Sequence, residues 1–291
     1  MNKNHSFVGS NVALITPMFE DGRVDYESLN NLIDFHIDSG TSSIVSVGTT
    51  GESATVGVKE HLKILDHTIK YAARRIPIIA GTGANSTSEA IELTQEAKNF
   101  GADACLLVTP YYNKPTQEGL FQHFKLIAES VSIDQILYNV PGRTAVDMSV
   151  DTTSRLSEIS NIIGIKDATG DLSVIKELVA KCPEDFLLLT GDDATAIDFL
   201  LFGGHGGISV TANVTPKELQ KAYLAAIAGN TELAKKLNEG LSGLHKNLFI
   251  ESNPIPVKWA LHKMGKCDNG IRLPLLELSN ECKTVLENDL K

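Results

Sequence analysis

Short apolar runs and longer amphipathic stretches alternate along most of the chain. The runs are rich in valine, isoleucine and leucine, and they are apolar throughout rather than at every second position. Such runs are typical of strands that are buried on both faces, as in a parallel sheet. Eight strands are predicted on this basis, over residues 12–16, 43–47, 76–80, 104–109, 135–139, 162–166, 186–190 and 207–210.

The stretches that separate these runs have the period of amphipathic helices. One apolar stripe comprises Leu29, Leu32, Ile33, His36 and Ile37. Parallel neighbouring strands need a crossover, usually helical and right-handed. Eight such units in succession predict a closed (β/α)8 barrel, the TIM barrel of the α/β class. An open doubly wound sheet usually carries a glycine fingerprint after its first strand, whereas Thr16-Pro17-Met18 stands there in this chain.

Only helical patterns follow the eighth strand, over residues 216–229, 232–249, 254–264 and 274–290. The first of these helices can close the barrel, and the others are predicted to form a C-terminal helical appendage. The length of 291 residues suits this arrangement, because an α/β barrel takes about 250 residues as one domain. We therefore expect a catalytic barrel over residues 1–230 and a helical region over residues 231–291.

Composition narrows the function classes. The net charge of −10, without any block of Lys and Arg, argues against a nucleic-acid partner. No apolar run approaches the roughly 18 residues that span a bilayer, and the polar segment 1–11 lacks the apolar centre of a signal peptide. A soluble, cytoplasmic protein is expected. The four cysteines stand far apart, without the spacing of a zinc site or a disulfide frame.

Lys166 is the first candidate for chemistry, because the active sites of such barrels lie at the carboxyl ends of the strands. It follows the apolar run 162–165, so its amine is expected at the barrel mouth, where loss of water lowers the pKa of a lysine. A neutral amine attacks ketones to form Schiff bases; the alternative is a lysine that reaches solvent. Tyr138 ends the preceding strand and can relay protons, unless only its ring is packed there.

Two further segments can hold carboxylates. Glycines let the backbone of residues 48–52 approach a ligand, and its N–H groups and two threonine hydroxyls can bind an anion. An ordinary capped loop has the same composition. Arg143 lies just beyond Tyr138 and can grip a carboxylate with two parallel bonds, although a surface arginine is an equal alternative.

The last two strand ends carry an acidic pair and a glycine cluster. Asp192-Asp193 is predicted to cap the next helix rather than to bind a cation. The cluster at residues 203–207 could cradle phosphate, as many barrels do near the last strands. It is predicted instead to form a tight turn that presents Ile208 and Ser209 to the pocket.

Four segments at strand ends are more specific together than any one of them alone. They are Gly48-Thr49-Thr50-Gly51-Glu52, Thr109-Pro110-Tyr111-Tyr112, Tyr138-Asn139-Val140-Pro141-Gly142-Arg143-Thr144 and Gly164-Ile165-Lys166-Asp167. In these segments the chain resembles the dihydrodipicolinate synthase and N-acetylneuraminate lyase superfamily, and within it most nearly the dihydrodipicolinate synthases. The resemblance extends from about Val12 to the C-terminal helices.

The resemblance implies a catalytic role for four residues. Lys166 matches the lysine that carries pyruvate as a Schiff base, and Tyr138 matches the tyrosine that relays protons above it. Thr49 matches the threonine that links this tyrosine to a second one. Tyr112 matches this second tyrosine, which family members lend across a tight dimer interface.

Further positions complete the implied substrate site. Thr50, together with the preceding threonine, would hold the pyruvate carboxylate, and Arg143 matches the arginine that receives the carboxylate of L-aspartate 4-semialdehyde. Gly191 and Ile208 match residues that line the lysine pocket. The implied lyase joins pyruvate to this aldehyde through an enamine and gives 4-hydroxy-tetrahydrodipicolinate, a precursor of lysine and diaminopimelate. No metal or organic cofactor is implied, because the lysine does the covalent work.

The resemblance also implies a homotetramer, built as a dimer of dimers, and feedback inhibition by lysine at the dimer interface. The positions that match the inhibitor site are Ser53, Ala54, His61, Asn85, Glu89 and Tyr111. Val58 departs from the pattern, since lysine-sensitive relatives often carry a histidine there, so regulation is a hypothesis.

Other functions stay open at this point. A related pyruvate-dependent aldolase for sialic acid or a 2-keto-3-deoxy sugar acid would share Lys166, Tyr138 and the loop 48–52, although Arg143 favours the short, charged aldehyde. A barrel that binds a ligand without catalysis would keep the fold, since a fold alone does not establish a function. A phosphate-binding barrel enzyme that uses residues 203–207 would leave Lys166 unexplained.

Overall fold

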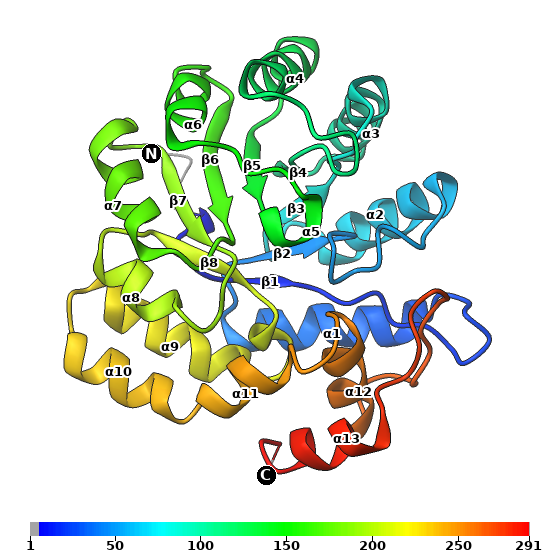
Figure 1. Ribbon diagram of the computed structural model, residues 1–291. Helices are drawn as coiled ribbons and strands as arrows, with labels where there is room; N and C mark the ends of the chain where they lie inside the picture. Colours follow the sequence, from blue (N-terminus) through cyan, green and yellow to red (C-terminus); the bar gives the residue numbers. More distant parts are fainter. Residues whose placement is uncertain (1–5, 291) are drawn as a thin grey trace.

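Eight parallel strands form the centre of the molecule. The computed structural model describes residues 6–290. Within them each strand pairs with the next and β8 pairs with β1, so the sheet closes into a barrel (Figure 1). The (β/α)8 prediction is therefore confirmed. The strands are β1 (Gly9–Ala13), β2 (Ser43–Ser46), β3 (Ile78–Gly81), β4 (Ala104–Val108), β5 (Gln135–Asn139), β6 (Ile162–Asp167), β7 (Leu187–Thr190) and β8 (Gly206–Ser209).

Helices surround this barrel (Figure 1). The first one shows how the sequence sets their ends, because the Asp25 carboxylate accepts hydrogen bonds from the N–H groups of Glu27 and Ser28, and Gly40 ends the helix with a φ of 75°. The helices are α1 (Tyr26–Ser39), α2 (Val58–Ala72), α3 (Thr87–Phe100), α4 (Gln117–Ser130), α5 (Pro141–Thr144), α6 (Val150–Ser157), α7 (Leu172–Lys181), α8 (Ala196–Leu201), η2 (Thr211–Asn213), α9 (Pro216–Ile227), α10 (Thr231–Glu239), α11 (Ser242–Asn247), α12 (Ile255–Lys263) and α13 (Asn280–Glu287).

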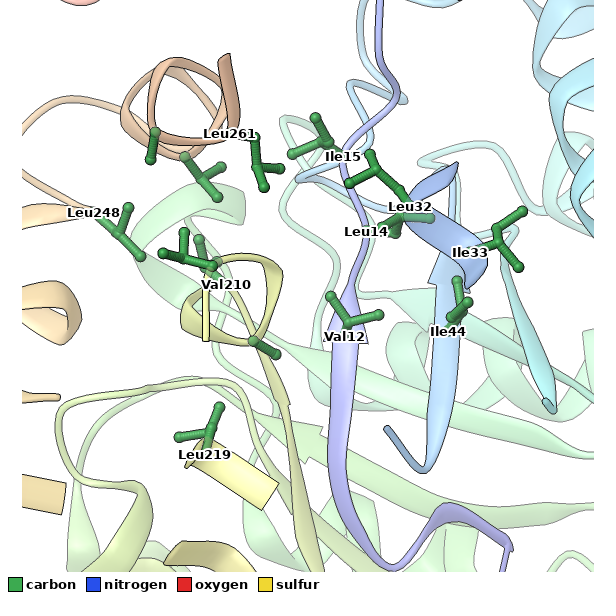
Figure 2. Close-up of a cluster of buried hydrophobic side chains, with 14 of the residues drawn as sticks. Val12, Leu14, Ile15, Leu32, Ile33, Ile44, Val210, Leu219, Leu248 and Leu261 are labelled. Carbon is green, nitrogen blue, oxygen red and sulfur yellow. The ribbon is translucent and has the colours of Figure 1, made fainter. Parts of the chain in front are cut away.

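Neighbouring residues of one strand belong to different layers of the core. In β2, Ile44 lies in the layer between the barrel and its helices, together with Leu32 and Ile33 of α1 (Figure 2). Val45, the next residue, belongs to the cluster that fills the barrel interior, with Ile79 of β3. Because both layers are buried, both strand faces must be apolar, and this accounts for the continuous apolar runs.

Strand β1 begins three residues earlier than predicted and ends at Ala13, so Thr16 is not part of it. The reason is that its first half is polar but buried. The Asn11 side-chain amide donates hydrogen bonds to the carbonyl oxygens of Phe7 and Gly207, at 2.9 and 3.2 Å. A buried polar side chain that is hydrogen-bonded can occupy a strand without an apolar signal in the sequence. The other strand boundaries differ from the prediction by at most two residues.

The C-terminal prediction was correct in kind and wrong in extent. The single helix predicted over residues 232–249 is two helices, α10 and α11, which are separated at Gly240, and glycine is a poor helix former. Of the stretch 274–290, only Asn280–Glu287 is helical. The division of the chain at residue 230 stays a prediction.

No helix within residues 6–290 combines the length and the apolar character needed to cross a membrane. The expectation for the polar N-terminus falls partly on residues 1–5, which lie outside the described residues.

Candidate active site

A cavity of about 180 Å³ opens at the carboxyl ends of the strands. It is lined by residues of six of the eight strand-to-helix connections and of the segment before α12. Of the residues predicted for the site, the cavity is lined by Thr49, Thr50, Tyr138, Arg143, Lys166 and Gly191. These six residues are spread over 143 positions of the sequence, from 49 to 191, and they come together only because the barrel closes.

Lys166 lies near the end of β6 and is paired in register with Tyr138 of β5. Its amine nitrogen is 4.3 Å from the centre of the Tyr138 ring, and the residue is only 6% exposed. Burial lowers the pKa of Lys166 to about 8. The Asp193 carboxylate acts to raise this pKa, and the Arg143 guanidinium acts to lower it further. A substantial fraction of this amine is therefore neutral near pH 8, which is the form that attacks a carbonyl carbon.

Tyr138 is buried beside this amine, with 7% of its surface exposed. Burial raises the pKa of its phenol, while the Arg143 guanidinium and a hydrogen bond with Thr49 partly offset that rise. The phenol is therefore protonated near neutral pH, and it stands between a nucleophile and a hydroxyl. This arrangement suits a group that passes protons to and from a substrate bound on the amine.

Gly191 leaves the space that the Lys166 side chain occupies. A Cβ atom at this position would lie 2.5 Å from Cε of Lys166 and 2.8 Å from Cβ of Ala168, both of them closer than real Cβ contacts allow. The backbone N–H of Gly191 donates a hydrogen bond to the Asp167 carbonyl oxygen at 2.6 Å. The absence of a side chain here thus determines the path of the lysine stem.

The loop after β2 has an unusual backbone. Val47 and Glu52, which flank Gly48–Gly51, have φ values of 51° and 60°, in the left-handed region that costs energy for residues with a side chain. Thr50 is 2% exposed and accepts a hydrogen bond at Oγ1 from the Asn253 side-chain amide at 3.0 Å. The main-chain oxygen of Asn253 in turn accepts a hydrogen bond from Arg143 at 3.1 Å.

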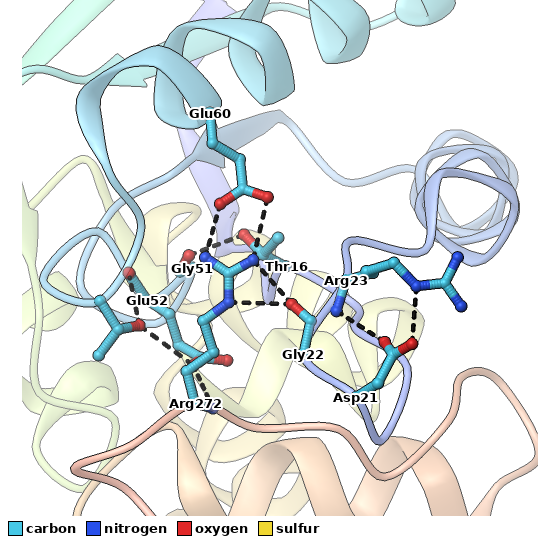
Figure 3. A network of polar contacts seen from close by, with 9 residues as sticks. Thr16, Asp21, Gly22, Arg23, Gly51, Glu52, Glu60 and Arg272 are labelled. Carbon is cyan, nitrogen blue, oxygen red and sulfur yellow. Dashed lines mark hydrogen bonds and ion pairs between the residues drawn. The ribbon is translucent and has the colours of Figure 1, made fainter.

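Residues of the C-terminal segment also contact this loop. The Glu52 carboxylate is buried and forms an ion pair with Lys258 of α12. It also accepts a hydrogen bond from the Arg272 backbone N–H at 3.2 Å (Figure 3). The Arg272 guanidinium binds both oxygens of Glu60, at 2.6 and 2.9 Å, and the carbonyl oxygen of Gly22. Three segments that are distant in sequence are therefore joined beside the cavity.

Sequence reasoning missed part of the lining. Phe249 and Asn253 belong to the C-terminal region but line the cavity, and Asp193 influences the charge of Lys166. Asp193 was expected to cap the following helix; its carboxylate instead accepts hydrogen bonds from the N–H groups of Val210 and Thr211, at 3.0 and 2.9 Å. A buried residue that follows the last barrel strand by 44 positions gives no strand-end signal, so the sequence offered no means of finding Asn253.

Two of the predicted site residues lie away from the cavity. Ile208 is 1% exposed and belongs to the cluster inside the barrel, beneath the lining. Tyr112 is 90% exposed, with a φ of 75°. The side chain of Tyr112 thus projects from the surface of this chain in a backbone conformation that is costly for a tyrosine.

The glycine cluster 203–207 lies at the opposite end of the barrel, because it leads into β8 and includes the first two residues of that strand. Its glycines permit close packing: a Cβ on Gly204 would overlap the Phe199 ring, and one on Gly206 would overlap the carbonyl oxygen of Gly9. The cluster therefore forms a packed turn rather than part of the cavity at the barrel mouth. Within residues 6–290, no group of three or more His, Cys, Asp or Glu side chains is arranged to hold a metal ion.

A second cavity, of about 280 Å³, adjoins the first. It contains five of the six positions predicted for an inhibitor, namely Ser53, Ala54, His61, Glu89 and Tyr111. The sixth, Asn85, does not line it, but its carbonyl oxygen accepts a hydrogen bond from the side chain of Asn113 at 2.8 Å. Thr49 and Arg143 line both cavities, so a ligand in the second one would contact residues of the first.

A closed barrel whose mouth contains a buried, partly neutral lysine beside a tyrosine and an arginine is the architecture of a Schiff-base enzyme. The chain belongs to the dihydrodipicolinate synthetase family, whose sequence model matches residues 6–291. It is 66% identical to a protein named 4-hydroxy-tetrahydrodipicolinate synthase from Ruthia magnifica subsp. Calyptogena magnifica, over 100% of this chain and 98% of that one. It is 60% identical to the protein of that name from Laribacter hongkongensis, over 97% of each chain.

Solved structures agree with this assignment. Dihydrodipicolinate synthase from Acinetobacter baumannii, in complex with pyruvate, superposes with a TM-score of 0.96 at 57% identity, over 98% of both chains. The enzyme from Cyanidioschyzon merolae, with lysine bound, superposes with a TM-score of 0.95 at 35% identity, again over 98% of both chains.

Proposed function

We propose that this chain condenses pyruvate with L-aspartate 4-semialdehyde to give 4-hydroxy-tetrahydrodipicolinate, a step of lysine and diaminopimelate biosynthesis in the cytoplasm. The observation that carries the proposal is the Lys166 amine, buried at the barrel mouth with its pKa lowered to about 8, 4.3 Å from the ring of Tyr138. The names of relatives that align over almost their whole length support the same reaction.

The residues of the cavity account for each step. The neutral amine of Lys166 attacks the keto carbon of pyruvate, and loss of water leaves a protonated imine that draws electrons from the methyl group. Loss of a methyl proton gives an enamine, whose carbon attacks the aldehyde. The amino group of the second substrate then attacks the imine carbon and displaces Lys166, which closes the ring. Tyr138 carries the protons between these steps.

The two substrate carboxylates have separate partners in this proposal. Thr49 and Thr50, in the loop after β2, bind the carboxylate of pyruvate, and Arg143 binds the carboxylate of the aldehyde. Gly191 leaves the space that the lysine side chain occupies. Hydrogen-bonding partners that are in place before the substrates arrive position the two reacting carbon atoms for bond formation.

Tyr112 is proposed to act on a neighbouring copy of the chain. Tyr112 is 90% exposed and has a costly backbone conformation. Both features are explained if its side chain enters the active site of another subunit. Its hydroxyl would then continue the proton path from Tyr138 through Thr49. We infer a tight dimer on this basis, and a tetramer made of two such dimers.

The decisive test is chemical trapping of the imine. Borohydride added with pyruvate should reduce it to a stable amine, and peptide mass mapping should find the adduct on Lys166. The adduct should be absent from Lys166→Ala and present in Lys70→Ala, which changes a largely exposed lysine. Trapping on another lysine, or none in the wild type, would contradict the proposal. Comparing condensation of L-aspartate 4-semialdehyde with cleavage of sialic acid and of 2-keto-3-deoxy sugar acids separates this enzyme from related aldolases.

The rate of imine formation should depend on pH through Lys166. Its pKa of about 8 means that the reactive neutral fraction grows about tenfold for each pH unit below that value and levels off above it. We expect kcat/KM for pyruvate to rise with this slope, to bend near pH 8 and to level off above that value. Initial rates measured between pH 6 and 9 test this, and a profile that is flat across the range would show that the amine is already neutral.

The second cavity is proposed to bind L-lysine as a feedback inhibitor. Glu89 lines that cavity, and its carboxylate can pair with an ammonium group. The shared residues Thr49 and Arg143 link the ligand to the active site. Millimolar L-lysine should lower the initial rate. Glu89→Gln should weaken the inhibition about tenfold, because a charged hydrogen bond is lost. Glu92→Gln changes an exposed residue of the same helix and should leave inhibition intact; unchanged wild-type rates with lysine would refute the site.

A further inference from the structure

Asn253 connects the two parts of the cavity that bind carboxylates in the proposed reaction. It lies just before α12, is 6% exposed and lines the cavity. Its side-chain nitrogen donates a hydrogen bond to Oγ1 of Thr50 at 3.0 Å, and its main-chain oxygen accepts one from Arg143 at 3.1 Å. A residue of the C-terminal region thus contacts both anion-binding groups, although it carries no charge itself.

The hydrogen bond to Thr50 determines what that hydroxyl can offer to a ligand. A hydroxyl has a single hydrogen and can both donate and accept. Because the Asn253 amide is the donor, the Thr50 oxygen is the acceptor in this pair, and its own hydrogen is left for another partner. Within the part of the chain that the structure describes, no hydrogen bond donated by this hydroxyl is present, and the residue lines the cavity.

The reverse arrangement would be unfavourable for an anion. If the Asn253 oxygen faced Thr50, the hydroxyl would donate its hydrogen to the amide and present only lone pairs to the cavity. A carboxylate would then meet an acceptor instead of a donor, which amounts to the loss of one charge-assisted hydrogen bond.

We propose that Asn253 is a positioning residue that turns the hydroxyl hydrogen of Thr50 towards the carboxylate of the bound ketoacid. The proposal rests on the proposed function, since it takes pyruvate as the ligand at Thr50. It assigns the C-terminal region a part in substrate binding: the segment before α12 sets the polarity of a hydroxyl that belongs to the loop after β2.

A double-mutant cycle between Asn253 and Thr50 tests the proposal. The quantity to measure is the pyruvate concentration that gives half-maximal borohydride trapping on Lys166, which needs no second substrate. Asn253→Ala should raise this concentration about tenfold, the effect of one hydrogen bond to a charged group. In a Thr50→Val background, where the hydroxyl is absent, Asn253→Ala should change it less than about twofold, because Asn253 has nothing left to orient.

A near-isosteric variant serves as a control for a simple loss of structure. Asn253→Asp supplies only acceptor oxygens when it is ionised, so it should withdraw the Thr50 hydrogen and raise the half-saturating pyruvate concentration at least as much as Asn253→Ala. A purely structural role predicts equal effects with and without the Thr50 hydroxyl, and that result would overturn the proposal, as would unchanged pyruvate binding in Asn253→Asp. Failure of the wild type to form any adduct would refute the proposed function. Normal trapping in the wild type, with a half-saturating pyruvate concentration that does not change when Asn253 is substituted, would refute only this inference.

Discussion

Lys166→Met is expected to abolish turnover and to make the folded protein more stable at neutral pH. Methionine keeps most of the volume of the lysine stem and has no amine, so neither an imine nor an enamine can form. The loss of kcat should be on the order of 10⁵-fold or more, the scale at which enzymes respond to removal of a covalent nucleophile. The gain in stability follows from the burial of the amine, because Lys166 as a whole is only 6% exposed.

The direction of the stability change follows from proton binding. The pKa of Lys166 falls from its usual value of 10.5 to about 8 on folding. Between these pH values the unfolded chain therefore binds more protons than the folded one, and the free energy of unfolding rises with pH. Below pH 8 the full cost is present, about 3 kcal/mol for a displacement of this size, and methionine removes it. The lost attraction of Asp193 is already included in this value.

Thermal unfolding at pH 7 should show a Tm for Lys166→Met that is several degrees above the wild type. The difference should shrink as the pH is raised from 8 towards 10.5, because the wild-type amine then loses its charge in both states. Lys70→Met makes the same chemical change at a largely exposed site and should leave Tm unchanged. A variant that is less stable than the wild type at pH 7 would mean that the amine is solvated or paired in the folded protein.

Lys258→Met is expected to destabilise the fold by about 3–5 kcal/mol, the usual cost of removing one partner from a buried ion pair. Lys258 and Glu52 are each 2% exposed, and burial lowers the pKa of Lys258 even though Glu52 acts in the opposite direction. Without the ammonium group, the Glu52 carboxylate retains the Arg272 N–H and the hydroxyl of Thr55, at 3.2 and 3.3 Å, but no buried cation.

Chemical denaturation of the single and double variants measures this pair. Glu52→Gln combined with Lys258→Met replaces both charges by neutral groups, so the double variant should lose clearly less stability than the two single variants added together. Asp21→Asn breaks the nearby pair with Arg23, whose side chains are 54% and 76% exposed, and should have no measurable effect (Figure 3). Additive losses at Glu52 and Lys258 would show that the two charges do not stabilise each other.

The catalytic consequence of Lys258→Met should be smaller than that of Lys166→Met and of a different kind. Glu52 ends the loop that carries Thr49 and Thr50, so a loosened Glu52 should weaken pyruvate binding more than it slows the chemical steps. The expected result is a raised KM for pyruvate with a kcat that stays within about tenfold of the wild type, because the reacting amine itself is untouched.

Agreement between sequence and structure was best where burial is uniform. The strand over residues 135–139 was placed without error. A strand with two buried faces leaves one apolar run in the sequence. At β1 the same reasoning failed. Its first residues are polar, and only the hydrogen bonds of Asn11 to other segments make them part of the sheet.

The sequence by itself determined the succession of strands and helices and the residues at the strand ends, since both depend on local period and on side-chain type. It could not determine that Asn253, Lys258 and Arg272 return to the loop after β2, because these contacts join positions more than 200 residues apart. The lowered pKa of Lys166 and the direction of the Thr50 hydroxyl also depended on the folded chain. Desolvation and hydrogen-bond polarity are properties of the surroundings, and only the closed barrel with its C-terminal helices supplies those surroundings.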